Sequence, residues 1–144
     1  MIPAPAAAAA NTKPVTEDNE TMAIDYQALK NRAFKDVEQT YTWKDSALYA
    51  LGIGFGQDPL DTRQLRFVYE GNGDQLTVPT MPVVMASPGF WVKEPDSGVD
   101  WVKVLHGEQS LTMHKPVPVQ GTVVATMKVT GIVDKGADKG AILV

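Results

Sequence analysis

Hydrophobic residues recur at helical spacing in the first half of the chain. Leu48 and Leu51 lie three positions apart, with apolar neighbours that fill the turn, and Thr42 with Asp45 has the layout of a helix-capping box. A glycine directly after this run is a typical helix stop. The pattern therefore predicts a helix over residues 43–51.

Two shorter patterns follow this helix. Residues 65–69 alternate well enough to predict a short strand, and the glycine-containing stretch 70–74 predicts the turn that ends it. Residues 80–87 are mostly apolar, with Thr80 able to cap and Pro82 tolerated in a first helical turn. A helix that is apolar on every side is a buried one, so we expect a buried helix here.

From residue 101 onward the pattern changes to long runs of strand-forming residues. Turn-like stretches at 115–118 and 134–140 interrupt these runs. The expected strands cover residues 101–105, 109–114, 121–133 and 141 onward. Helices followed by a meander of strands predict an α+β fold, and the last two runs should form a hairpin.

The two ends of the chain differ from the rest. Residues 1–21 are rich in Ala and Pro and then polar, which predicts a disordered linker or an artificial extension, with the domain covering residues 22–144. No Lys or Arg precedes Lys13, so the basic start of a signal peptide is missing. The last five residues have the apolar character of an opening strand, and we expect that the domain is truncated there.

Composition narrows the possible functions. The 144 residues are 44% hydrophobic and 21% charged, which is typical of one globular domain. The net charge of −4 argues against nucleic-acid partners, and no apolar run approaches the roughly 18 to 20 residues of a membrane helix. The chain has no cysteine, so neither a disulfide nor a thiolate zinc site is expected.

One segment carries a family resemblance. Residues 104–118, Val104-Leu-His-Gly-Glu-Gln-Ser-Leu-Thr-Met-His-Lys-Pro-Val-Pro118, resemble the non-catalytic half of MaoC-like hydratase 2 enzymes, the hydratase component of multifunctional β-oxidation proteins. Further similar stretches occur in order along the chain, at 41–42, 48–54, 65–71, 79–80 and 133–136. Together they cover residues 41–144, which makes the match specific.

The resemblance implies a hot dog fold, in which a curved antiparallel sheet wraps around a central helix, here residues 80–87. It also implies a division of labour between two such units. The carboxy-terminal unit of the family carries the motif Asp-x-Asn-Pro-x-His, whose Asp and His activate the water that adds to a 2-enoyl-CoA. This chain has two histidines, neither in that motif, and residues 56–61 look like a degenerate counterpart without the imidazole. The resemblance thus implies that this chain alone holds no catalytic residue.

Three residues are expected to bind substrate on the strength of the resemblance. His106 and Gly107 match the segment that lines the acyl-CoA site, and Lys135 corresponds to a lysine that contacts CoA. An ammonium group at a hairpin tip suits multiply charged phosphates. The plainer alternatives are an ordinary turn at His106 and a merely solvated lysine at Lys135.

Other polar residues have simpler interpretations. Glu108 lacks a paired base, and we expect it, with Gln109, to hydrogen-bond at the strand entry. Asp58 and Asp61 have no further oxygen ligands near them in the sequence pattern, so they make a poor calcium or magnesium site. We expect them to cap a loop instead. The glycines of residues 52–56 do not fit a phosphate-binding loop, because they follow a helix. The three tryptophans are expected in the core or at an interface.

The resemblance gives a complete functional hypothesis. The chain would be the acyl-chain and CoA-binding half of an (R)-specific 2-enoyl-CoA hydratase, with no cofactor and with a catalytic hot dog unit in the same polypeptide or as a partner chain. The enzyme would assemble as a dimer of double hot dogs. It would be located in the cytoplasm if bacterial, or alternatively in the peroxisomal matrix. The alternatives are a non-enzymatic acyl-CoA-binding or lipid-binding subunit and a hot dog thioesterase.

Overall fold

Short helices and two pairs of strands make up the structure, a computed structural model that describes residues 24–71, 73–136 and 139–144. In chain order, the α-helices and strands are α1 (Tyr26–Lys30), β1 (Val37–Tyr41), α2 (Trp43–Gly52), α3 (Thr62–Val68), β2 (Gly121–Ala125), β3 (Ile132–Asp134) and β4 (Ala141–Leu143). Four short 3₁₀ helices lie between α3 and β2: η1 (Met81–Val84), η2 (Trp91–Lys93), η3 (Pro95–Ser97) and η4 (Trp101–Lys103).

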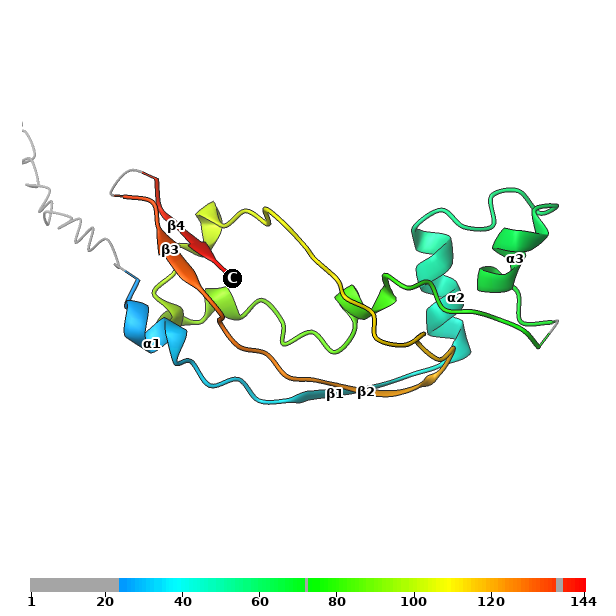
Figure 1. The fold of residues 1–144 in the computed structure, drawn as a ribbon, viewed down its shortest axis with the longest axis horizontal. Coiled ribbons are helices and arrows are strands. Elements are labelled where there is room, and N and C mark those ends of the chain that lie inside the picture. The colour runs from blue at the N-terminus through cyan, green and yellow to red at the C-terminus, as the bar shows by residue number, and fades with distance from the viewer. Residues whose placement is uncertain (1–23, 72, 137–138) are drawn as a thin grey trace, which may run out of the picture.

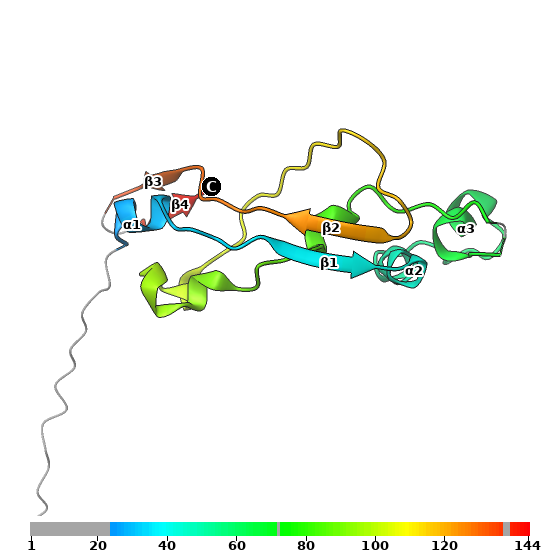
Figure 2. The same cartoon turned by 90° about the horizontal axis from the view of Figure 1, so that it is seen from below.

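The antiparallel pair β1–β2 connects the two ends of an elongated molecule. Its register places Val37 opposite Ala125 and Tyr41 opposite Gly121. Helices α2 and α3 lie at one end of this ribbon, while α1 and the β3–β4 hairpin lie at the other (Figure 1). The same arrangement is seen from below in Figure 2.

Two sequence predictions are confirmed at the level of single elements. Helix α2 begins after Thr42, whose backbone N–H donates to Oδ2 of Asp45 at 2.7 Å, as a capping box requires. The hydrogen bonds from Thr42 hold the pKa of Asp45 below its ordinary value. The predicted hairpin is the antiparallel pair β3–β4, with Ile132 opposite Leu143.

The strand predicted over residues 65–69 is wrong, because residues 65–68 belong to helix α3 and Tyr69 is its C-cap. Asp61 caps this helix by accepting a hydrogen bond from the backbone of Arg63 (3.0 Å). The half-buried positions of α3 fall at 64, 65, 67 and 68, which is helical spacing. Phe67 packs against Phe55 with ring centroids 4.9 Å apart. A window of five residues was too short to distinguish the alternation of a strand from the spacing of a helix.

The buried central helix predicted over residues 80–87 is also wrong. The structure has only the 3₁₀ helix η1, with Val83 and Val84 exposed. Ala86 adopts a left-handed conformation (φ 46°) that a helix cannot continue, and Pro88 disfavours helical geometry in the residue before it. Between Pro82 and Pro88 too few residues remain to nucleate a stable α-helix.

Three of the four predicted strand runs need correction. Residues 101–103 form the 3₁₀ helix η4, and residues 104–105 and 109–114 pair with no strand among the described residues. The run 121–133 divides into β2 and the start of β3. Strand-forming side chains favour an extended backbone, but a ladder also needs a neighbouring strand.

The core lies where α2 and η1 meet the β1–β2 ribbon. Tyr41, Met81 and Met85 form its buried centre, and Val117 and Val123 pack against them. Ser46, on α2, is fully buried beside them. This cluster joins residues that are more than 80 positions apart in the sequence, so it fixes how the chain closes on itself.

The α+β class and its antiparallel strands are confirmed and are consistent with a hot dog fold. The described strands form two separate pairs rather than one continuous curved sheet. The expected linker at residues 1–21 and the boundary at residue 22 lie outside the described residues. Within the described part of the chain, no helix has the length and apolar character needed to cross a membrane.

Candidate functional site

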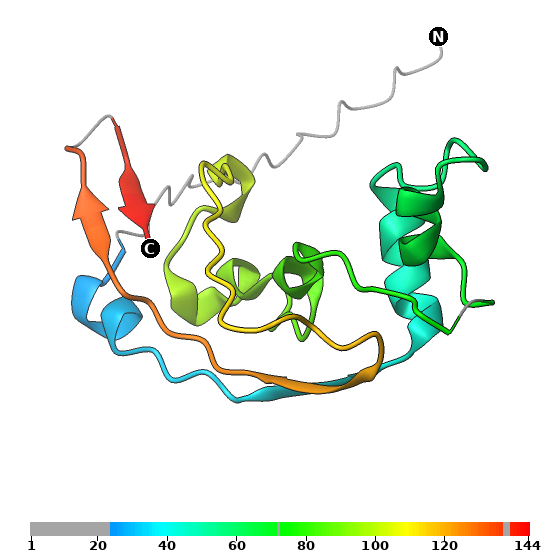
Figure 3. The same ribbon diagram turned by 45° about the vertical axis from the view of Figure 1, so that its right-hand side comes forward.

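His106 and Gly107 lie in an extended segment, residues 101–116, whose residues are all exposed. Figure 3 shows the chain leading from η4 through this segment to the turn that enters β2. Nε2 of His106 donates a hydrogen bond to the carbonyl oxygen of Glu108 at 3.0 Å. Because that contact is local, the imidazole remains exposed and accessible to a ligand.

The backbone at Gly107 has free space on its side-chain side. A Cβ atom built there would meet no other atom of the described chain within 4 Å. The glycine is therefore not required by packing within this chain. Its expected role in letting a ligand approach the backbone stays a prediction.

Lys135 lies just beyond β3, where the chain turns toward β4. Its backbone N–H donates to the carbonyl oxygen of Gly140 at 2.9 Å, which closes the hairpin. The next residue, Gly136, has φ 97° and donates its N–H to Oδ1 of Asp134 at 2.8 Å. The exposed lysine thus follows β3 directly, next to these two hydrogen bonds. Within the described residues, no hydrogen bond or ion pair joins it to His106.

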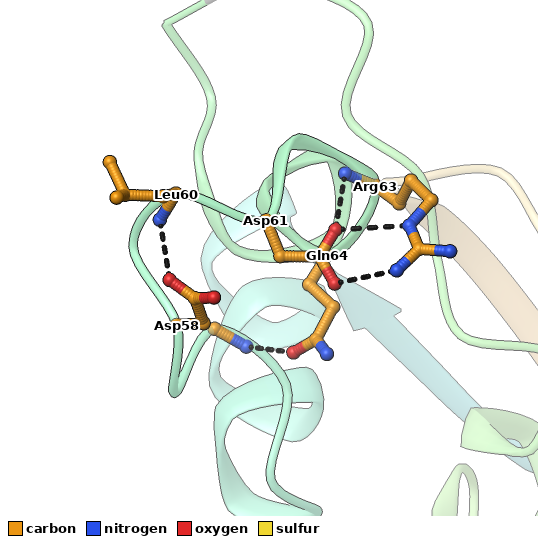
Figure 4. A network of polar contacts seen from close by, with 6 residues as sticks. Asp58, Leu60, Asp61, Arg63 and Gln64 are labelled. Carbon is orange, nitrogen blue, oxygen red and sulfur yellow. Dashed lines mark hydrogen bonds and ion pairs between the residues drawn. The ribbon is translucent and has the colours of Figure 1, made fainter.

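In the loop of residues 56–61, which resembles a degenerate catalytic motif, two aspartates accept hydrogen bonds from nearby backbone N–H groups (Figure 4). Oδ1 of Asp58 accepts from the backbone of Leu60 at 2.9 Å, and Asp61 caps α3. The side chain of Arg63 donates to Asp61 at 3.1 Å, and this bond lowers the pKa of that carboxyl. The loop-capping interpretation of Asp58 and Asp61 is confirmed.

Glu108 and Gln109 make short-range hydrogen bonds only. Nε2 of Gln109 donates to the carbonyl oxygen of Ser110 at 3.1 Å, and the Ser110 hydroxyl donates to Oε1 of Glu108 at 3.4 Å. Their expected place at the entry of a strand is wrong, since residues 109–114 form no ladder.

An aromatic cluster lies at the start of this segment. The sequence predicted that its tryptophans would be in the core or at an interface, but not which residues they would contact. Trp101 meets Phe90 edge to face, with centroids 6.3 Å apart, and the ammonium of Lys93 lies 4.3 Å from the centre of the Trp101 ring. Trp91 is half-buried and packs against Phe34 at 5.2 Å. These contacts hold residue 101 against the preceding 3₁₀ turns.

Sequence reasoning missed a group of buried hydroxyls at the other end of the segment. Tyr41, Ser46 and Thr77 come from β1, α2 and the stretch before η1, and all three reach the carbonyl oxygens of Pro118 or Val119. Burial raises the pKa of the Tyr41 hydroxyl. The one available signal was Ser46, a hydroxyl on the apolar face of the predicted helix.

A shallow cavity of about 510 Å³ lies against α3, away from the predicted site residues. Its lining is Thr62, Arg63, Arg66, Phe67, Asp74 and Leu76. Arg66 pairs with Asp74 at 3.2 Å, so positive and negative groups offset each other in the cavity. Among residues 24–71, 73–136 and 139–144, no cluster of acidic or histidine side chains is arranged to hold a metal ion.

Comparison with known proteins identifies the family. Residues 39–144 match the family described as MFE-2 hydratase 2 N-terminal domain. The chain is 36% identical over 129 residues to a probable enoyl-CoA hydratase 2 of Dictyostelium discoideum, which covers 85% of this chain and 41% of that protein. It is 37% identical over 103 residues to peroxisomal multifunctional enzyme type 2 of Mus musculus, covering 68% of this chain and 14% of that protein.

A plant relative gives the same picture. The peroxisomal enoyl-CoA hydratase 2 of Arabidopsis thaliana is 35% identical over 113 residues, which cover 75% of this chain and 36% of that protein. The chain therefore spans less than half the length of each of these relatives. Since the family match extends over residues 39–144, this chain belongs to the MFE-2 hydratase 2 N-terminal domain family.

Proposed function

We propose that this chain is the acyl-chain and CoA-binding half of an (R)-specific 2-enoyl-CoA hydratase. The complete enzyme would add water reversibly to a trans-2-enoyl-CoA and give a (3R)-3-hydroxyacyl-CoA. The observation that carries the proposal is the match to the family's N-terminal domain in a chain without an Asp-x-Asn-Pro-x-His motif. Relatives named as hydratases support the reaction class.

The role of residues 56–61 supports the assignment of chemistry to another unit. Where the motif would supply a proton-transferring His, this chain has Asp61. The carboxylates of Asp58 and Asp61 accept hydrogen bonds from backbone N–H groups. A carboxylate committed to capping is poorly placed to activate water, because general-base catalysis needs a free acceptor beside the reacting atoms.

Binding is the contribution that we assign to this chain. His106 and Gly107 would line the path of the acyl thioester, and the ammonium of Lys135 would contact phosphates of CoA. The backbone of Lys135 is already hydrogen-bonded to Gly140, so its exposed ammonium would reach a multiply charged ligand without new ordering at that residue. The hydration itself requires neither a metal nor a redox cofactor.

The partner would be a catalytic hot dog unit, in the same polypeptide or as a second chain. The exposed segment 101–116 carries large apolar side chains, including Leu105, which is 90% exposed, and Leu111. Apolar side chains on an unpaired extended segment are suited to an interface. We propose that two such double units associate as a dimer.

The relatives' names bear on the compartment. Of the three relatives described above, two are named as peroxisomal proteins, one from Mus musculus and one from Arabidopsis thaliana. On that ground we propose the peroxisomal matrix rather than the bacterial cytoplasm. Fluorescence microscopy of the tagged full-length protein beside a peroxisomal marker tests this, and a diffuse cytoplasmic signal would contradict it.

One assay distinguishes the proposed hydratase from its two rivals. The protein that contains both units is incubated with a trans-2-enoyl-CoA, and loss of the enoyl thioester, release of free CoA thiol and the chirality of the product are measured. We expect loss of the enoyl group, a (3R) product and no thiol. Thiol release would instead indicate a thioesterase, and neither enoyl loss nor thiol release would indicate a non-enzymatic subunit.

A further inference from the structure

Contacts with the rest of the molecule hold the exposed segment 101–116 at its two ends. At the first end, Trp101 packs against Phe90 and beneath the ammonium of Lys93. Between the ends, the described side-chain hydrogen bonds of residues 104–116 are local and join residues 106 to 110. The position of His106 and Gly107 therefore depends on where the ends are fixed.

Three buried hydroxyls fix the second end, and we call them the hydroxyl clasp. The hydroxyl of Tyr41 donates to the carbonyl oxygen of Pro118 at 2.7 Å, and that of Thr77 donates to the same oxygen at 2.9 Å. The hydroxyl of Ser46 donates to the carbonyl oxygen of Val119 at 2.7 Å. A carbonyl oxygen has two lone pairs, so Pro118 can satisfy both of its donors.

The clasp lies where two prolines reduce the number of backbone donors available for a strand ladder. Proline has no N–H to donate, so Pro116 and Pro118 cannot pair with a neighbouring strand as donors. Ladder pairing with β1 begins only at Gly121. The carbonyl oxygens before it take their hydrogen bonds from side chains instead.

Because the three hydroxyls of the clasp are buried, they should hold the carbonyl oxygens of Pro118 and Val119 within a narrow range of positions. Ser46 is 0% exposed, Tyr41 2% and Thr77 8%, so these hydroxyls have little access to water. A buried hydroxyl without a partner is costly, and the geometry of such a bond tolerates only small displacements. Val117 also packs against Tyr41, which adds an apolar contact at the same end.

We propose that Tyr41, Ser46 and Thr77 are positioning residues for acyl-CoA binding, because the clasp sets where the segment carrying His106 and Gly107 leaves the core. This inference rests on the proposed function of that segment. None of the three hydroxyls is assigned a contact with substrate. Loss of the clasp should let the segment shift while the core stays folded.

The test uses the two-unit protein and variants that change only one hydroxyl. Thr77→Val is nearly isosteric and removes the hydroxyl, Thr77→Ser keeps it, and Tyr41→Phe removes a second donor to the same oxygen. The dissociation constant of a saturated acyl-CoA, octanoyl-CoA, is measured by calorimetry below the melting temperature of every variant. KM and kcat for the corresponding 2-enoyl-CoA are measured alongside.

We expect Thr77→Val and Tyr41→Phe to raise the dissociation constant and KM by about threefold to tenfold, with kcat within about twofold. Thr77→Ser, which keeps the hydroxyl, should bind octanoyl-CoA with the wild-type dissociation constant. An unchanged dissociation constant in both variants, with only a lower melting temperature, would overturn the positioning role and show that the clasp is merely structural. Because octanoyl-CoA cannot be hydrated, this result is independent of whether the wild-type protein is a hydratase.

Discussion

His106 and Lys135 carry the proposed contacts with acyl-CoA, and each lies on exposed backbone outside regular secondary structure. His106 is held by one local bond to Glu108, and Lys135 by the hydrogen bond that closes its hairpin. The only described partner of the His106 side chain is a backbone oxygen two residues away, and no hydrogen bond or ion pair is described for the ammonium of Lys135. Substitutions there should change ligand binding with little effect on folding.

Replacing Lys135 by Ala in the two-unit enzyme should raise KM about fivefold to a hundredfold, because it removes one charge directed at phosphate. The effect should shrink at high salt, where exposed charges are screened. Steady-state kinetics at two ionic strengths measures both. Lys139→Ala, on the same hairpin, is the matched control and should leave KM nearly unchanged. Equal effects of the two substitutions would mean that only the net charge matters.

His106→Ala should raise KM while kcat stays within about tenfold, since binding shared by ground and transition states appears in KM. His114→Ala, in the same exposed segment, controls for loss of any imidazole. Steady-state kinetics of both variants gives the comparison. A thousandfold fall in kcat at unchanged KM would show that His106 belongs to the catalytic machinery.

Among the elements, helix α2 shows what local sequence can specify. Its capping box involves residues three positions apart, so the pattern could be read directly from the chain. The β3–β4 hairpin was equally local. Helix α3 was predicted wrongly as a strand, because its short apolar run fits both helical and strand spacing and packing decided between them. The 3₁₀ helix η1 was predicted wrongly as a longer helix, because Pro88 disfavours its continuation.

The capping box predicts how stability depends on pH. The pKa of Asp45 is lowered in the folded protein, so its contribution to stability is complete above the ordinary value of 3.8 and is lost as pH falls through the lowered pKa. Melting temperatures between pH 7 and pH 2.5 measure this. Asp45→Asn should reduce the loss on acidification, whereas Asp36→Asn, an exposed carboxylate before β1, should not. Identical pH profiles for the Asp45 variant and the wild type would contradict the account.

At the scale of the whole molecule, the family and the order of its motifs were visible in the sequence, while the contacts between distant segments were not. Tyr41, Ser46 and Thr77 converge on residues 118 and 119 only after the chain folds. No spacing rule connects them, so the hydroxyl clasp could not be predicted. The roles of His106, Gly107 and Lys135 stay predictions of the family resemblance.

The exposed apolar side chains of segment 101–116 predict that the chain self-associates in the absence of a catalytic unit. Leu105→Ser combined with Leu111→Ser should shift the population toward monomer, because it removes apolar area from that segment. Sedimentation velocity measures the shift. Leu60→Ser is the control, since Leu60 is 85% exposed but lies in the loop before α3. An equal response to both changes would argue against an interface on the segment.

The central claim is that this chain binds acyl-CoA and leaves the chemistry to another unit. The most direct test is the rate at which the purified chain hydrates a trans-2-enoyl-CoA, measured alone and after addition of a catalytic hot dog unit of the family. We predict no hydration above background by the chain alone, and activity after the catalytic unit is added. Hydration by the chain alone at a rate comparable to that of the two-unit enzyme would contradict the claim.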